Sequence, residues 1–538
     1  MSLRLNRFAS HCKKQREYEL KRDWNVSLLP RRGRFKRAPL TLASALVITL
    51  SACGGGGNPA DPPPPRLENS SVTTTGNPLV AQYSVTVSGA ASVSVEYGTS
   101  TSYGSQTSSQ VTPAGGGTVI ILVAGMMQST AYHMRADVSS ASGVVNDTDH
   151  IFQTSAIPAD QVPYAQVTIG SGQQPSPGLR LVSALSETFA LDSTGNVLWY
   201  YKIPGAQDPF YLTKPMSNGH MLILVNFAGP PIDSTLREVD LAGNTIRELT
   251  QSDLAQKLTA AGYNINLVSI DHDVLILPNG HWLFIVSDSR TFTDLPGYPG
   301  QTVVQGNAVV DVDQNNNPTW VWDAFDHLDV NRHPMNFPDW THANSLFFVP
   351  DDGSFLLSLR HQSWVLKIDY QTGVGPGDVV WKLGYQGDFT LQNSNSPSDW
   401  FFAEHDANIV SSNLTGSFQL ALWDNGNDRV VDDAGDTCSP SGTPCYSTAA
   451  IFNVDETNMT ASRAWSYQTP FSYWGGSVQL LANNNVLFDE TAPSDIQGSR
   501  SIETTQQANP PIIWTLTTPL VEPMYRVKLI PSLYPQQP

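Results

Sequence analysis

The sequence predicts an all-β protein in which a six-bladed β-propeller follows a small β-sandwich. Two hairpin patterns recur through most of the 538 residues, and helical periodicity is nearly absent apart from a short patch around Ser252. A blade of four short strands cannot bury both of its faces without neighbouring blades, so hairpins that recur at regular intervals are typical of a propeller.

The first recurring hairpin is an apolar run, a turn rich in Gly, Asn or Asp, and a second apolar run. Its five copies are PMSNGHMLIL, LPNGHWLFIV, VPDDGSFLLSL, SSNLTGSFQLAL and LANNNVLFDE, which begin at Pro215, Leu277, Val349, Ser411 and Leu481.

The second recurring hairpin has an apolar residue and Asp, a polar turn, and a strand that often carries Trp. Its copies begin at Leu191, Val239, Val310, Ile368 and Val454, and a looser sixth copy begins at Ile502. Together the two patterns predict six four-stranded units within residues 157–538, which we expect to form one domain.

Residues 66–156 form a different segment, rich in Ser, Thr and Val with alternating strands such as AQYSVTVSG from Ala81. Its run STAYHMRADV resembles the late-strand region of fibronectin type III domains, and about 90 residues suffice for such a β-sandwich. Few residues in it could form a site, so we expect a fibronectin- or immunoglobulin-like spacer or docking module.

The first 52 residues predict export. They carry 12 of the 30 basic residues and three of the 48 acidic ones, and the basic stretch RRGRFKR precedes the apolar run APLTLASALVITL. This order is typical of a secretory signal peptide. Its end, Leu50-Ser51-Ala52-Cys53, resembles the lipobox of bacterial lipoproteins, which implies cleavage before Cys53 and lipid attachment to its thiol.

Residues 53–65 then form a Gly- and Pro-rich tether. We therefore expect an exported bacterial lipoprotein, anchored to a membrane such as the outer membrane and facing the periplasm or the cell exterior. A plain signal peptide with a chance cysteine is the alternative.

Cys438 and Cys445 are the two cysteines left for the folded body, because Cys12 and Cys53 belong to the leader and its cleavage site. An exported compartment is oxidising, so we predict a disulfide between them. Their segment contains no histidine or second cysteine pair for a zinc site.

Three histidines, His272, His342 and His405, each begin an apolar strand-like run and are followed closely by a small or acidic polar residue, at spacings of 70 and 63 residues. The innermost strands of a propeller line its channel, so we expect the three imidazoles to share one site. Alternatively, each histidine could have only a structural role, capping its strand and hydrogen-bonding to the adjoining turn. Three imidazoles could also bind zinc or copper. The carboxylates of Asp273, Glu404 and Asp406 would then accept hydrogen bonds from the metal-binding rings.

The segment from His272 to Asn427 resembles the bacterial arylsulfate sulfotransferases, six-bladed propeller enzymes that do not use the nucleotide sulfate donor. The matching residues are His272 in DHDVLILPNG, His342 and Asn344 in His-Ala-Asn, Arg360 at the end of the next strand, and His405 in EHDANI, which LWDNGNDR follows. The chain departs from the family at Glu404, where related sequences often have an amide residue.

The resemblance implies transfer of a sulfuryl group from a phenolic sulfate ester to a phenolic acceptor, with His405 as the nucleophile and a sulfohistidine as the intermediate. It implies that Arg360 and Asn344 bind the sulfuryl oxygens. His272 and His342 would donate to these oxygens or protonate the leaving phenolate.

Other residues could share these roles. Arg290 and Arg429 occupy positions in their units comparable to that of Arg360, which could instead form a surface ion pair. Up to two aromatic residues could bind the aryl ring, from the set Trp340, Trp400, Phe401, Phe402, Tyr473 and Trp474.

The sequence contains neither a P-loop nor a dinucleotide-binding glycine motif, which argues against nucleotide donors. We expect no cofactor, no resident metal and no nucleic-acid partner. Two other classes stay open: a propeller that binds a ligand or partner without turnover, and a metal- or quinone-dependent propeller enzyme. The sequence also leaves open whether the chain forms a homodimer.

Overall fold

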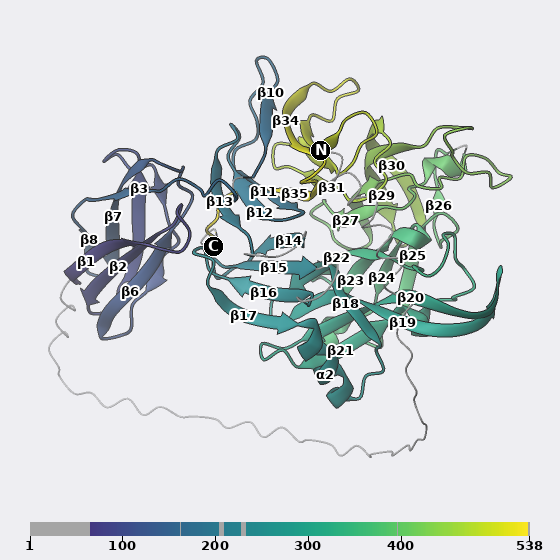
Figure 1. Cartoon of the computed structure of the whole chain (residues 1–538), viewed down its shortest axis with the longest axis horizontal. Coiled ribbons are helices and arrows are strands. Elements are labelled where there is room, and N and C mark those ends of the chain that lie inside the picture. Colours follow the sequence, from purple (N-terminus) through teal and green to yellow (C-terminus); the bar gives the residue numbers. More distant parts are fainter. Residues whose placement is uncertain (1–64, 162, 204–208, 227–232, 395, 536–538) are drawn as a thin grey trace, which may run out of the picture.

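The computed structural model describes residues 65–161, 163–203, 209–226, 233–394 and 396–535 (Figure 1). The predicted signal peptide, the predicted lipid-attachment residue Cys53 and nearly all of the predicted tether lie outside these residues. Within the described residues, no helix has the length and apolar character needed to cross a membrane.

The described residues are nearly all β, as predicted. The helices are α2 (Gln251–Ala261), α3 (Ala324–His327) and three single 3-10 turns, η1 (Arg360–Gln362), η2 (Gln371–Gly373) and η3 (Pro397–Asp399). The helix α2 is the predicted patch around Ser252. It begins where the Thr250 hydroxyl accepts a hydrogen bond from the Asp253 amide, and it ends at Gly262, whose φ of 84° is left-handed.

The amino-terminal strands form two sheets. One contains β1 (Arg66–Thr74), β2 (Ala81–Ser88) and β6 (Gly116–Val123); the other contains β3 (Ser92–Gly98), β4 (Ser105–Gln106), β5 (Gln110–Val111), β7 (Ala131–Ser140), β8 (Gly143–Asn146) and β9 (His150–Gln153). Alternate residues of β2 are buried, and they pack with apolar residues of the second sheet in one core. A fibronectin-like topology stays a prediction.

The rest of the chain forms six sheets of four or five strands within the described residues. The first three contain β11 (Leu179–Ala184), β12 (Thr188–Leu191), β13 (Val197–Tyr201) and β35 (Met524–Ile530); β14 (Phe210–Pro215), β15 (Met221–Asn226), β16 (Thr235–Val239) and β17 (Thr245–Thr250); and β18 (Leu267–Ile276), β19 (Trp282–Leu295), β20 (Tyr298–Val312) and β21 (Pro318–Asp323).

The other three contain β22 (Ala343–Val349), β23 (Ser354–Leu359), β24 (Trp364–Ile368) and β25 (Val379–Gly384); β26 (Thr390–Leu391), β27 (His405–Ile409), β28 (Ser417–Asp424), β29 (Tyr446–Asp455) and β30 (Thr460–Pro470); and β10 (Gln166–Ile169), β31 (Ser477–Leu480), β32 (Val486–Glu490), β33 (Gly498–Thr504) and β34 (Ile512–Pro519).

These sheets contact one another in cyclic order. Contacts join β11 to β14, β15 to β18, β18 to β22, β22 to β27, β27 to β31 and β31 to β35, and β35 lies in the same sheet as β11. The two ends of the chain therefore meet twice, because β35 pairs with β11 and β10 pairs with β34. This order fits the predicted propeller, and the assignment of the sheets as six blades stays a prediction.

The tryptophans of the second hairpin pattern join neighbouring sheets. The indole N–H of Trp199 donates to the Leu241 carbonyl (3.0 Å), that of Trp322 to the Gly377 carbonyl (3.0 Å), and that of Trp514 to the Ser193 carbonyl (2.9 Å). In each case the acceptor lies in the second hairpin turn of the next sheet. The recurring Trp is thus explained by contacts between sheets, since a buried indole needs an acceptor for its N–H.

The amino-terminal sheets pack firmly against the rest of the molecule. In Figure 1 they lie to one side, and the carboxyl-terminal residues lie between them and the other sheets. The Tyr534 hydroxyl donates to the Leu122 carbonyl (3.0 Å) and accepts from the Ala124 amide (2.6 Å). Leu79 and Val80 belong to apolar cores shared with the later sheets.

A cluster of buried and partly buried charges joins the strands that lie nearest the centre. Lys214 of β14 contacts Asp273 of β18 (2.5 Å). Arg526 of β35 lies between Asp273 (3.3 Å) and Asp406 of β27 (3.4 Å), and Lys528 also contacts Asp406. We call these five residues the central ion cluster.

Asp489 of β32 lies beside this cluster without a cation of its own. One oxygen of its carboxyl accepts from the Ser477 hydroxyl and the Val527 amide, and the other oxygen is buried without a partner. Burial raises the pKa of Asp489 to about 8.

We predict that Asp489→Asn makes the protein more stable than the wild type at alkaline pH. The raised pKa means that folded Asp489 keeps a proton that the unfolded chain, with a carboxyl pKa of about 4, has released. The stabilisation that this proton gives to the folded wild type is complete below about pH 4 and is lost as the pH rises through about 8. In calorimetry, the melting temperature of Asp489→Asn minus that of the wild type should therefore be larger at pH 9 than at pH 5. An equal difference at both pH values would contradict a protonated Asp489.

Candidate active site

The three predicted histidines come together on adjacent strands. His272 lies in β18, His342 immediately precedes β22 and His405 begins β27. The ring centroids of His272 and His342 are 4.7 Å apart, and both His272 (6.2 Å) and His405 (6.0 Å) lie beside the ring of Tyr525 from β35. The three histidines therefore lie near one another, and their sharing of one functional site stays a prediction.

A register shift near each histidine explains how its side chain leaves the regular alternation of the strand. The shifts fall between Asp271 and Val274, between Ala343 and Ser345, and between His405 and Asn408. His272 and His342 have left-handed φ values of 45° and 48°. Such β-bulges redirect side chains, and left-handed non-glycine residues of this kind cluster at functional sites.

Two of the imidazoles are held by carboxylates. Nδ1 of His272 is 2.6 Å from Asp271, and Nδ1 of His342 is 2.5 Å from Asp339. Burial is the largest single effect on both rings and lowers their pKa. At His272 the charge and hydrogen bond of Asp271, together with the charge of Asp339, exceed this effect and raise the pKa, whereas the pKa of His342 stays below its usual value. The two rings therefore offer one readily charged and one mostly neutral imidazole, each with Nε2 available.

The third imidazole is held by an amide. Nδ1 of His405 is 2.6 Å from Oδ1 of Asn425, whose amide nitrogen donates to the carbonyls of Ser472 (2.7 Å) and Gly475 (3.0 Å). Because these two bonds fix the amide orientation, His405 Nδ1 must carry the hydrogen and Nε2 a lone pair. Burial and the charge of Arg360 lower the pKa of His405 well below its usual value, so the ring is a neutral base.

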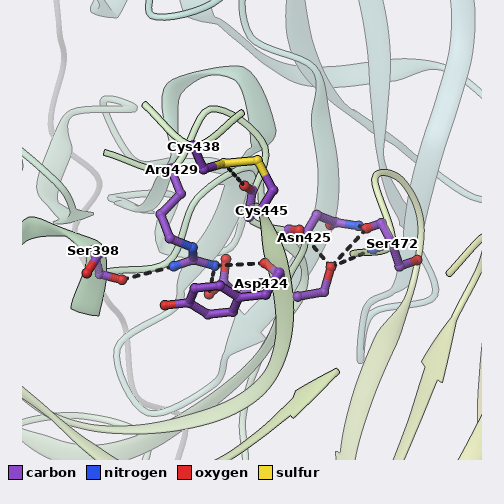
Figure 2. Close-up of a disulfide and its surroundings, with 10 residues drawn as sticks. Ser398, Asp424, Asn425, Arg429, Cys438, Cys445 and Ser472 are labelled. Carbon is purple, nitrogen blue, oxygen red and sulfur yellow. Dashed lines mark hydrogen bonds and ion pairs between the residues drawn. A yellow bond between two sulfur atoms is a disulfide. The ribbon is translucent and has the colours of Figure 1, made fainter. Parts of the chain in front are cut away.

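Figure 2 shows how the chain holds Asn425. Arg429 contacts Asp424 at 2.7 Å and donates to the carbonyls of Ser398 and Trp400. The predicted disulfide between Cys438 and Cys445 closes the following loop, and the Cys438 amide donates to the Arg429 carbonyl (2.8 Å).

Neither arginine considered as a substitute for Arg360 is free to bind a ligand. Arg429 is fully buried and holds the loop beside Asn425. Arg290 forms ion pairs with Asp288, Asp323 and Asp326.

Arg360 lies in η1 and is 8% exposed. Its Nη2 donates to the Tyr473 carbonyl (2.8 Å), its Nη1 contacts Nε2 of His361 (2.5 Å), and its Nε is buried without a partner. The side chain is therefore not in the surface ion pair considered as its alternative role. Sequence reasoning missed His361, although it directly follows Arg360.

Asn344 and Glu404 form a buried pair beside the histidines. The Asn344 amide nitrogen donates to the Glu404 carbonyl (2.6 Å), and its oxygen is buried without a partner. Glu404 accepts from the Ser358 hydroxyl (3.0 Å), and burial raises its pKa to about 8. The carboxyl that departs from the family pattern thus contacts Ser358 and is largely neutral at pH 7.

Three aromatic side chains surround the histidines. The Tyr525 ring is 4.4 Å from Phe210 and 6.5 Å from Trp474. Tyr525 Oη and Trp474 Nε1 are buried without partners. Sequence reasoning considered Trp474 but missed Phe210 and Tyr525.

Of the other predicted aromatics, four lie in sheet cores and Tyr473 lies beside Arg360, which donates to its carbonyl. Trp340, Trp400, Phe401 and Phe402 belong to the apolar cores of the sheets, and Tyr473 is 42% exposed.

Among the described residues, one group has the spacing of metal ligands, namely Asp339, His342 and His361. A cation there would face the guanidinium of Arg360, which already occupies Nε2 of His361. The carboxylates of Asp273 and Asp406, expected behind a metal, instead belong to the central ion cluster. The arrangement therefore favours an anionic ligand over a metal ion.

A sequence model of the arylsulfotransferase (ASST) family matches residues 171–518, which include every candidate residue from His272 to His405. No curated protein matches the chain.

Similar solved structures include an auxiliary nutrient binding protein from Bacteroides ovatus (11% identity, 80% of this chain and 82% of that chain, TM-score 0.28). They also include the dihydro-heme d1 dehydrogenase NirN (14%, 64% and 68%, TM-score 0.29) and Kuenenia stuttgartiensis hydrazine synthase (10%, 55% and 75%, TM-score 0.23). These likenesses are too low to support any conclusion about fold or function.

We predict that His405 stays neutral, with its hydrogen on Nδ1, at pH 6, where an ordinary histidine is largely charged. In protein labelled with 15N at its 11 histidines, the His405 signal, assigned by its loss in His405→Gln, should show this tautomer. Asn425→Asp should move its protonation to higher pH, because a carboxylate favours the charged ring.

The surface variant Asn453→Asp is the matched control and should leave the His405 titration unchanged. A wild-type His405 that titrates near pH 6.5 would contradict the assignment.

Proposed function

The chain belongs to the arylsulfotransferase (ASST) family, and on that premise we propose that it transfers a sulfuryl group from a phenolic sulfate ester to a phenolic acceptor. The observation that supports this most strongly is the neutral imidazole of His405. Its Nδ1 hydrogen is held by Asn425, which leaves the Nε2 lone pair free for attack.

In the first step, the lone pair of His405 Nε2 forms a bond to sulfur as the bond from sulfur to the phenolic oxygen breaks. Protonated His272, whose pKa is raised, gives its proton to the departing phenolate. In the second step, neutral His272 takes the proton of the acceptor phenol as its oxygen attacks sulfur and Nε2 leaves. Each proton and electron pair is thereby restored.

The amide partner of His405 suits both steps. A sulfuryl group on Nε2 leaves the imidazole ring with a positive charge, and a carboxylate at Nδ1 would stabilise that charge and slow the second transfer. The neutral oxygen of Asn425 orients the ring without this stabilisation. His272 and His342 have carboxylate partners instead, which suits groups that carry protons.

Arg360 and the aromatic side chains bind the two parts of the donor in this proposal. The partnerless Nε of Arg360 donates to the sulfuryl oxygens, whose negative charge grows as the ester bond breaks. Phe210, Trp474 and Tyr525 contact the aryl ring.

We further propose that the six sheets are the blades of a propeller within residues 157–538, and that residues 66–156 are a fibronectin-like β-sandwich. The cyclic contacts of the sheets support the first assignment. We also propose that the protein is exported and anchored through Cys53. The signal-like leader supports this, and the disulfide between Cys438 and Cys445 is compatible with an oxidising compartment.

We predict that the purified protein releases nitrophenolate from 4-nitrophenyl sulfate faster when phenol is present. His405→Ala should lower this rate by more than about 1,000-fold, since it removes the nucleophile. Intact-mass measurement after donor alone should show one added sulfuryl group on the wild type and none on the variant.

His220→Ala is the control, because His220 pairs with Glu238 in a hairpin turn away from the site. Wild-type rates in His405→Ala would rule out this nucleophile, and release that does not depend on phenol would indicate a sulfatase.

A further inference from the structure

His361 contacts the arginine on which the proposed transfer depends, although no step of that transfer uses it. Its ring is buried, and it lies in η1, immediately after Arg360. What this ring does for Arg360 follows from its hydrogen bonds.

The hydrogens of this contact can be assigned. Nη1 of Arg360 is 2.5 Å from Nε2 of His361, and a guanidinium can only donate, so Nε2 must accept with its lone pair. Nδ1 of His361 then carries the hydrogen and donates to the Asp339 carbonyl (2.8 Å). His361 is therefore neutral, and burial lowers its pKa to about 3, which agrees with that state.

The ring is also fixed in position. It stacks on His342 with ring centroids 4.7 Å apart, and its backbone amide donates to the Thr341 carbonyl (3.1 Å). The Arg360 amide donates to the His342 carbonyl (3.3 Å). A rigid acceptor of this kind can hold a flexible arginine in one orientation.

The partners of Arg360 differ from those of other buried arginines in the chain. Arg180 contacts Glu503, Arg429 contacts Asp424 and Arg526 contacts Asp273, so each has a carboxylate beside it. Arg360 bonds to an imidazole and to a main-chain carbonyl, both neutral. Among the described residues no carboxylate contacts this guanidinium, and the charge of Asp339 acts on it only from farther away.

We propose that His361 is a positioning residue that orients Arg360 while leaving its positive charge available to an anionic sulfuryl group. The inference rests on the proposed function. A carboxylate at position 361 would hold the guanidinium at least as firmly, but it would cancel the charge that attracts the sulfuryl oxygens.

The test compares His361→Gln with His361→Glu, because the two side chains are matched in size and both can accept from Arg360, while only Glu is charged. The expected result is a kcat/KM for 4-nitrophenyl sulfate within about 10-fold of wild type for Gln and at least about 100-fold lower for Glu, mainly through KM. Binding of inorganic sulfate, followed by tryptophan fluorescence, should weaken in the same order. Equal values for Gln and Glu in both assays would overturn the proposal.

A double-mutant cycle separates this role from a purely structural one. In an Arg360→Met background, changing His361 to Glu should weaken sulfate binding by less than about 2-fold, since the charge that Glu cancels has gone. An undiminished effect would show that His361 does not act through Arg360, and thermal melting identifies any variant that has not folded. Wild-type protein that binds sulfate but transfers none would contradict the proposed function alone, whereas wild-type protein that binds no sulfate would contradict the role of Arg360.

Discussion

The central ion cluster is the interaction on which the rest of the structure depends. Burying a charge costs free energy unless the charge is paired. Asp273, Asp406 and Arg526 can therefore be buried at the centre only because Arg526 pairs with both carboxylates. Each directly follows a site residue, namely His272, His405 or Tyr525. The pairing that joins the strands therefore also sets the distances between the imidazoles and the aromatic ring, and Arg526 extends the network to the carbonyl of Asn344 (3.1 Å).

Within that framework, the partner at Nδ1 gives each imidazole its chemical character. Asp271 and Asp339 hold two rings with negative charge, and Asn425 holds the third with a neutral oxygen. Arg360 also has neutral partners, so its positive charge acts with burial, the larger effect, to lower the pKa of His405. Three copies of one residue type thus differ in the direction of their pKa shifts because their neighbours differ.

Sequence patterns could predict the strands that carry His272, His342 and His405, because hairpin turns and alternating apolar residues are local signals. They could also predict the disulfide, since two cysteines were left for the folded body. They could not predict Asn425 as the partner of His405. The two residues are 20 positions apart, and no local sequence signal shows which distant polar side chain contacts the ring. Tyr525 was missed for a related reason, since β35 joins the first sheet from the far end of the chain.

That pairing of β35 with β11 has a consequence for how the molecule folds. Arg526 of β35 contacts Asp273 across a sequence separation of 253 residues. Contacts between residues so far apart in the sequence close long loops, so they form late in folding. The sheets between β11 and β35 must therefore be in place before the centre of the molecule is complete.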